Sequence, residues 1–339
     1  MNKKLLAIAV GAAMVAPVVA TAGVTVYGRA QVEVANYSVD TPTVNGSGTT
    51  TKLKNSSVDG VDVLDAGGQG RVGIKASEDL GNGLTGIAKY EFKADAADNS
   101  VTSAGGSLSA RDSMVGLKGS FGTVMLGNLK SPYKYAGGVK YDPFVTTALE
   151  ARKHGGMSSG SLGHNGFVND LIAYATPKGP VTAAVAYGAA ENDGLVSLDV
   201  KYHQGGIEAF VAYIDSGDRL NGGVSGDDTA YSATKIGGQF KTGPHKISLQ
   251  YEDITDTDSA GVDTSPTVVF LGYQMKMGKN TFAIQAGQTS FDTTTDDATY
   301  TALGIIHKFS KETRVYAGYR DTSDVESVVT VGLRKDFKK

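Results

Sequence analysis

Charged side chains recur at alternate positions in the N-terminal third of this chain, where they could order ions and polar solutes. Alternate residues of an extended strand point to the same face, so these charges share one face. Arginine and lysine outnumber glutamate on it. The residues are Arg29, Glu33, Arg71, Lys75, Lys89, Glu91, Lys93 and Arg111. A crowded basic face of this kind indicates an electric field rather than bond-breaking chemistry.

Motifs that could support catalysis lack the surroundings that catalysis needs. Gly81 to Gly86 fits G-x-G-x-x-G, but another strand follows it, so no helix N-terminus can hold a pyrophosphate. Gly156 to Gly160 fits G-x-S-x-G in a polar loop without a strand-to-helix turn. The five histidines share no metal-ligand spacing, and the aspartates from Asp253 to Asp258 lack the closing glutamate of a calcium loop. The sequence therefore predicts no enzyme, metal or cofactor.

The stretch from Arg71 to Lys93 shows the unit that positions the charges. Val72, Ile74 and Ala76 alternate with polar or small residues, a turn follows at 79–83, and the alternation resumes to Lys93. This pattern predicts a β-hairpin with one apolar and one charged face.

The N-terminal segment predicts export from the cytoplasm. Lys3 and Lys4 precede an apolar run, which ends in the small residues Ala20, Thr21 and Ala22. This is typical of a signal peptide over residues 1–22, leaving residues 23–339 as the mature domain. The mature chain has no cysteine and no second long apolar segment, and the mild acidity of the chain gives no indication of nucleic-acid binding.

About sixteen alternating segments of roughly ten residues follow, the length at which a tilted strand crosses a bilayer. Tight turns alternate with longer, Asp-rich connections such as 40–68, 216–228, 254–265 and 290–297. Aromatic residues cluster near the predicted strand ends, as in the interfacial girdles of a membrane barrel. They are Tyr27, Tyr37, Phe92, Tyr202, Phe240, Tyr251, Tyr273, Phe309, Tyr319 and Phe337. Because an open sheet in lipid leaves edge amides unpaired, we expect an all-β, closed, transmembrane antiparallel barrel with a wet interior. The alternation does not settle which face of 207–214 is outward.

Three stretches carry a resemblance to a known family. SEDLGNGL at 77–84, FGTVMLG at 121–127 and VGLRKDF at 331–337 resemble the Gram-negative general porins. The resemblance implies a homotrimer of sixteen-stranded barrels in the outer membrane, surrounded by lipid and lipopolysaccharide. Such porins usually end on an aromatic residue that the barrel-assembly machinery recognises, whereas here Phe337 is followed by two lysines.

The same resemblance implies a role for the long insertion from Lys130 to Gly166, which is too long for a compact connection. It would be the third external loop, folded into the lumen to form a constriction, with Tyr141 to Phe144 matching the DPF element of that loop. Asp142 and Glu150 would then face the basic wall, to which the last strand adds Arg334.

The leading functional prediction is passive diffusion of small hydrophilic solutes and ions through a water-filled channel. Basic residues slightly outnumber acidic ones on the predicted wall, so we expect weak selectivity with a slight preference for anions. A solute-specific channel for an anion such as phosphate or a carboxylate is the alternative. An outer-membrane hydrolase barrel and a soluble exported β-protein are the remaining classes.

Overall fold

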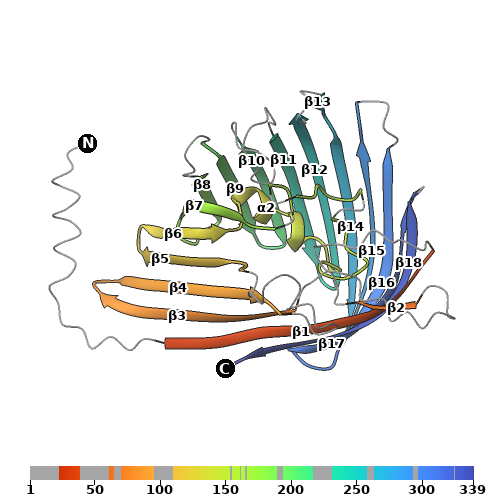
Figure 1. Ribbon diagram of the computed structural model, residues 1–339, viewed down its shortest axis with the longest axis horizontal. Coiled ribbons are helices and arrows are strands. Elements are labelled where there is room, and N and C mark those ends of the chain that lie inside the picture. The colour runs from red at the N-terminus through yellow and green to blue at the C-terminus, as the bar shows by residue number, and fades with distance from the viewer. Residues whose placement is uncertain are drawn as a thin grey trace, which may run out of the picture.

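A single closed antiparallel sheet organises the chain in the computed structural model (Figure 1). The structure describes residues 23–38, 61–64, 70–94, 110–152, 155–160, 162–164, 166–188, 194–216, 231–257, 263–292, 297–323 and 325–339. The predicted signal peptide and most of the long polar connections lie outside these ranges. No helix in the described ranges is both long and apolar enough to span a bilayer.

Within the described ranges the sheet has eighteen strands, of which two are short, leaving sixteen that form the wall. The first eight long strands are β1 (Gly23–Tyr37), β3 (Arg71–Gly81), β4 (Leu84–Lys93), β5 (Ser113–Gly119), β6 (Gly122–Leu129), β7 (Val168–Ala175), β8 (Val181–Gly188) and β9 (Val196–Gln204). The second eight are β10 (Ile207–Asp215), β11 (Tyr231–Thr242), β12 (His245–Thr257), β14 (Thr267–Met277), β15 (Asn280–Ser290), β16 (Ala298–Lys308), β17 (Thr313–Thr322) and β18 (Glu326–Lys338). The short elements are β2 (Val61–Leu64), β13 (Asp263–Thr264), the helix α2 (Pro132–Tyr135) and the 3-10 turn η2 (Gly138–Lys140).

The barrel closes where β1 pairs with β18. Their register runs from Tyr27 opposite Lys338 to Tyr37 opposite Val328, so the first and last strands leave no free edge between them. Each remaining long strand pairs antiparallel with its neighbours. The predicted strands agree with the structure to within two residues at most ends. The alternation predicts strands over 109–118 and 245–253, and the largest differences are found there. β5 begins only at Ser113, and β12 extends to Thr257 into the predicted 254–265 loop.

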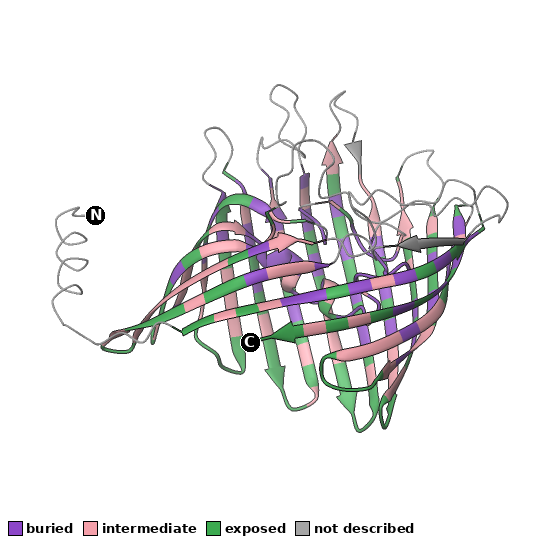
Figure 2. Cartoon of the chain, turned by 60° about the horizontal axis from the view of Figure 1, so that its bottom comes forward, coloured by how far each residue is buried: buried purple, intermediate pink, exposed green. Residues whose placement is uncertain are grey.

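Exposed apolar residues alternate with buried or polar ones along the strands, and Figure 2 shows this as alternating colours on each strand. On β1, Val24, Val26 and Val34 are exposed, whereas Gln31 and Glu33 are buried. The exposed set continues around the wall through valine, leucine, isoleucine and phenylalanine, as expected for a surface in contact with lipid.

Two aromatic residues that we expect in the interfacial girdles lie on the inner face of the barrel instead. Tyr27 points inward and its hydroxyl donates to the Glu91 carboxylate, 2.9 Å away, while Tyr37 is buried. Both occupy odd positions of β1, which share the inner face with Arg29 and Glu33. The strand register therefore outweighs the preference of tyrosine for a membrane interface.

The structure also settles the faces of β10. Val211 is exposed and Phe210 is buried, so apolar side chains cover both faces. The inner one packs on Tyr141, with the two ring centroids 5.8 Å apart in an edge-to-face arrangement. A segment from elsewhere in the chain therefore covers the inside of this strand.

Candidate functional site

That segment is the inner loop, Lys130 to Gly166, which connects β6 to β7. Figure 1 shows it with α2 inside the ring of strands. Ser131 begins α2 as its N-cap, because its hydroxyl accepts the Lys134 amide, and Pro132 fits the first helical turn. Gly137 and Gly138 then adopt positive φ of 59° and 53°. A side chain at Gly137 would lie 2.5 Å from the Phe210 ring, so glycine lets the loop turn closely against the wall.

A buried polar cluster joins the two ends of the inner loop to β11 and β12. Glu252 accepts hydrogen bonds from the Tyr133 hydroxyl at 2.7 Å and from the Ser158 hydroxyl at 2.6 Å. Lys235, directly opposite Glu252 in the sheet, donates to the Tyr133 carbonyl at 2.6 Å. Neither Lys235 nor Glu252 is exposed. Charge and hydrogen bonding are therefore both satisfied beneath the loop, which makes this cluster an anchor.

His164 completes this anchor as a neutral ring. Its Nε2 lies 2.8 Å from the Lys235 ammonium, which can only donate, so Nε2 accepts and the proton is on Nδ1. Nδ1 in turn donates to the Ser158 carbonyl at 3.0 Å. Burial, with Lys235 adding to it, lowers the pKa of His164 to about 3. Ser158 and His164 are in contact, as in a hydrolase, but both side chains are buried and serve to hold the loop.

A second set of contacts fixes the middle of the inner loop. Asp142 accepts from the Phe144 and Ala151 amides at 2.7 and 2.9 Å, and from Gln285 of β15 at 2.9 Å. Burial raises the pKa of the Asp142 carboxyl to about 6 against the effect of these donors. The Tyr300 hydroxyl of β16 donates to the Leu149 carbonyl at 2.6 Å.

The loop also contacts β1, next to the closure of the barrel. Gln31 donates to the Thr146 carbonyl at 2.6 Å, and Glu33 accepts from the Ala148 amide at 2.8 Å. Since β1 lies across the barrel from β11 and β12, the inner loop spans the lumen from one wall to another.

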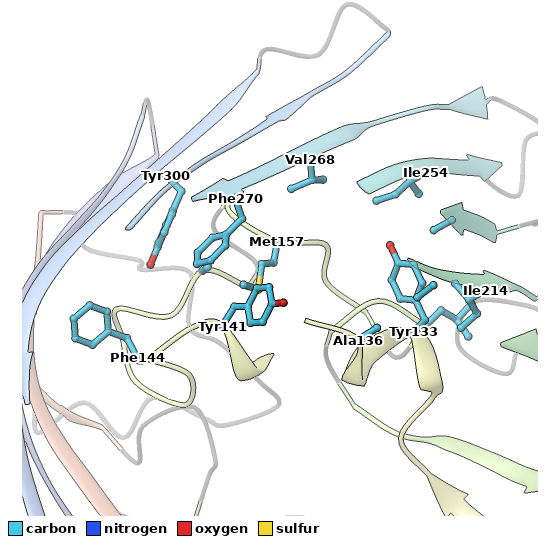
Figure 3. Close-up of a cluster of buried hydrophobic side chains, with 14 of the residues drawn as sticks. Tyr133, Ala136, Tyr141, Phe144, Met157, Ile214, Ile254, Val268, Phe270 and Tyr300 are labelled. Carbon is cyan, nitrogen blue, oxygen red and sulfur yellow. The ribbon is translucent and has the colours of Figure 1, made fainter. Parts of the chain in front are cut away.

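Apolar side chains of the loop pack on a wall lined with small residues. Figure 3 shows Phe144, Tyr141 and Met157 near Phe270 and Tyr300 of the wall. A Cβ at Gly304 would lie 3.0 Å from the Phe144 ring, and one at Gly318 would lie 2.5 Å from Leu149. These two glycines face each other across β16 and β17 and leave room for the loop.

Basic residues dominate the inner face opposite the loop. Asp336 pairs with three arginines within 3.1 Å, Glu91 with two arginines within 3.5 Å, and Asp112 with two lysines. Asp336 pairs with Arg29, Arg314 and Arg334, Glu91 pairs with Arg71 and Arg111, and Asp112 pairs with Lys89 and Lys130. Seven cations thus share three carboxylates, and these clusters carry an excess of four positive charges.

Three basic side chains lie around one aromatic ring at the base of the inner loop. The cationic groups of Arg111, Lys130 and Lys134 lie 5.1, 5.8 and 4.9 Å from the centre of the Phe167 ring. Burial and the neighbouring cations hold the pKa of Lys134 well below its usual range. Arg111 and Lys130 therefore concentrate positive charge where the loop leaves the wall.

The structure divides the predicted site residues into two groups. Most of the predicted wall residues lie on the inner faces of β1, β3, β4 and β18 or at their ends: Arg29, Arg71, Lys75, Lys89, Glu91, Lys93 and Arg334. Arg111 precedes β5 and pairs with Glu91. Arg29, Arg71 and Lys93 stand directly opposite one another across three strands. By contrast, Glu33, Asp142 and Glu150 are at most 3% exposed and bind the loop itself, so they do not face the arginines across open water.

Several important residues were not predicted from the sequence. Asp112 falls inside the predicted segment 109–118 and Lys130 begins the predicted insertion, but neither was predicted as a wall charge. Lys235, Glu252 and His164 gave no signal of their own. Lys235 and Glu252 do occupy inward positions of their strands. The alternation along a strand is the same, however, whether an inward residue faces water or lies beneath a loop.

Comparisons with known proteins agree with this architecture. A family model described as Gram-negative porin matches residues 7–327. A major outer membrane protein P.IB of Neisseria gonorrhoeae is 37% identical over 135 residues, which are 40% of this chain and 34% of that protein. The same-named protein of Neisseria lactamica is 36% identical over 137 residues, or 40% of this chain and 36% of that protein. The chain thus spans about a third of the length of the curated relatives it matches.

Solved structures show the same fold. An anion-selective porin from Comamonas acidovorans has a TM-score of 0.72 at 21% identity, covering 93% of this chain and 100% of that one. The trimer form of OmpT from Vibrio cholerae has a TM-score of 0.67 at 16% identity, covering 93% and 99%.

The family match extends over nearly the whole chain, and the closed barrel exposes an apolar outer surface of the kind that lipid covers. Both features place the protein in the outer membrane. The chain belongs to the Gram-negative porin family.

Proposed function

We propose that this protein forms a water-filled channel through which small hydrophilic solutes and ions diffuse passively across the outer membrane. The observation that carries the proposal is the segregation of the two faces of one closed sheet. Apolar residues are exposed on the outside, while the paired arginines and lysines of the basic wall and the buried Lys235 and Glu252 lie on the inside. A barrel of about sixteen strands is wide enough to enclose an aqueous channel.

The inner loop would set the narrowest part of this channel. It is fastened to β1 on one side and to β11, β12, β15 and β16 on the other, so it can occupy part of the lumen without moving with the solute. We assign Glu33, Asp142 and Glu150 to this attachment. The basic wall residues, together with Glu91, would line the remaining passage.

The excess of basic residues supports a preference for anions. Seven cations share three carboxylates on the wall, and the loop carboxylates that could oppose them are buried. A positive lining raises the local concentration of anions and lowers that of cations. The preference would be weak, because each of these seven cations shares a carboxylate.

The barrel would function as a homotrimer, surrounded by outer-membrane lipid and lipopolysaccharide and inserted by the barrel-assembly machinery. Support for the trimer comes from the fold, since the similar OmpT was solved in a trimer form. The apolar outer wall offers surface both for other copies and for lipid.

Planar-bilayer recording of the purified protein tests the channel function. Stepwise current increases with a linear dependence on voltage are expected, and a reversal potential in a potassium chloride gradient should have the sign of an anion preference. Absence of current from folded protein would contradict the channel, whereas a cation-selective current would contradict only the preference.

A further inference from the structure

Lysines line the inner face of the barrel at the end that carries the short turns. Lys241 of β11, Lys246 of β12, Lys276 of β14 and Lys308 of β16 form what we call the lysine belt. Their strand neighbours Phe240, Ile247, Met277 and Phe309 are exposed on the outer face, so the lysines point inward. Short turns mark the periplasmic rim of such barrels, which places the belt at the periplasmic end of the lumen.

The belt differs from the basic wall near the loop in that no ion pair holds its lysines in the part of the chain that the structure describes. Each of the seven wall cations has an ion pair, whereas within the described ranges none of the four belt lysines forms one. Lys241, Lys276 and Lys308 are exposed to solvent, and Lys246 is half-buried. Their charges are therefore free to act on a solute.

The sheet register brings these like charges together. Lys241 stands directly opposite Lys246, and Lys308 stands directly opposite Arg314, which in turn faces Arg334. Like charges in directly opposed positions destabilise a sheet. Lys308 is repelled by Arg314, Lys276 and Arg334, so the charges share one region of the lumen.

Two carboxylates act on the belt from other elements. Glu208 of β10 and Asp142 of the inner loop attract Lys246, while Lys241 and Lys308 repel it. Asp142 is already saturated by two backbone amides and Gln285. The belt thus keeps a positive excess that a ligand could neutralise.

We propose that the lysine belt is a binding site for small multivalent oxyanions such as pyrophosphate at the periplasmic end of the channel. Neighbouring strands are about 4.8 Å apart, so one anion with several charged oxygens can contact lysines on two strands at once. A monovalent anion can neutralise the charge of only one lysine. This site lies at the short-turn end of the lumen, beside Arg314 of the basic wall, and its detection rests on the proposed channel function.

Block of the channel current by pyrophosphate tests the site. Recordings in about 0.1 M salt keep the screening length near 10 Å. The K241Q/K246Q and K276Q/K308Q variants should each weaken the apparent affinity for pyrophosphate roughly tenfold, because each removes two of the four positive charges of the belt. Acetate, which carries one charge, should block the wild type far more weakly.

K118Q is the matched control. Lys118 is also exposed and lies at the short-turn end of the inner face, but on β5, away from the belt. It should leave the block unchanged. An equal loss of affinity in K118Q and the belt variants would show a general charge effect and overturn the site, as would an unchanged affinity in both belt variants. Absence of current from the wild type would instead contradict the channel itself.

Discussion

Replacing Glu252 with glutamine should release the inner loop from the wall. Glu252 accepts the Tyr133 and Ser158 hydroxyls and lies opposite the buried Lys235. The E252Q variant removes the anion that compensates Lys235 and turns a side-chain amide toward two donors. Breaking a buried pair by removing one partner costs roughly 3–5 kcal/mol. We expect most of that cost in the loop contacts, because the strands keep their backbone hydrogen bonds.

The absence of cysteine from the chain provides a specific assay. A single cysteine at Ala136, which is fully buried three residues after Tyr133, reacts with a thiol reagent only when the loop opens. Since every 1.4 kcal/mol is tenfold, E252Q should speed labelling by roughly a hundredfold or more. The current through single channels should become noisier at the same time.

Two further variants test whether Glu252 anchors the loop. E91Q removes a buried carboxylate whose partners Arg71 and Arg111 belong to the basic wall, so it should leave labelling near the wild-type rate. E252Q/K235M removes both charges and should label more slowly than E252Q alone. Equal labelling of E252Q and the wild type, with the barrel folded, would refute the anchoring role.

Three other predictions concern pH and selectivity. The pKa of the Asp142 carboxyl, about 6, is above its unfolded value of 3.8, so the native state binds a proton that the unfolded state has already lost. The stability of the loop should therefore fall by up to about 3 kcal/mol as the pH rises from 4 to 6. D142N should flatten that part of a plot of thermal midpoint against pH. The pKa of His164, about 3, is below its unfolded value of 6.5, so His164 affects the free energy of unfolding in the opposite direction. Stability is lost as the pH falls from 6.5 towards 3, because the unfolded state binds a proton that the buried ring does not. H164Q should remove that loss in the same measurement. D336N leaves three arginines without their shared carboxylate and should shift the reversal potential toward stronger anion preference, whereas an unchanged potential would place these arginines outside the conducting path.

The strands were predictable because membrane and water impose a period of two on each of them. The alternation predicts a strand over 122–129, and β6 has these bounds, while closure follows from the cost of unpaired edges in lipid. Tyr27 was misplaced because residue type suggested the interface, while register decides the face. The faces of β10 could not be assigned because its inner side packs on the loop and is as apolar as its outer side.

The site was predictable only in part. Inward-facing arginines and lysines follow from the same period, and the structure places them where expected. Which charges meet water depends on where the inner loop lies, and that arises from contacts between residues more than one hundred positions apart, such as Ala148 with Glu33. No local pattern distinguishes Glu252, which holds the loop, from Glu91, which faces the basic wall.

The position of the inner loop also constrains the order in which the chain can fold. Its middle part is held by β1, the first strand, and by β15 and β16, near the end of the chain. A loop cannot readily thread into a finished cylinder, so it should already lie over the later strands when β1 meets β18. Docking and the final zippering of the seam would then form one cooperative event, and a half-assembled barrel would leave Gln31 and Glu33 without their loop partners.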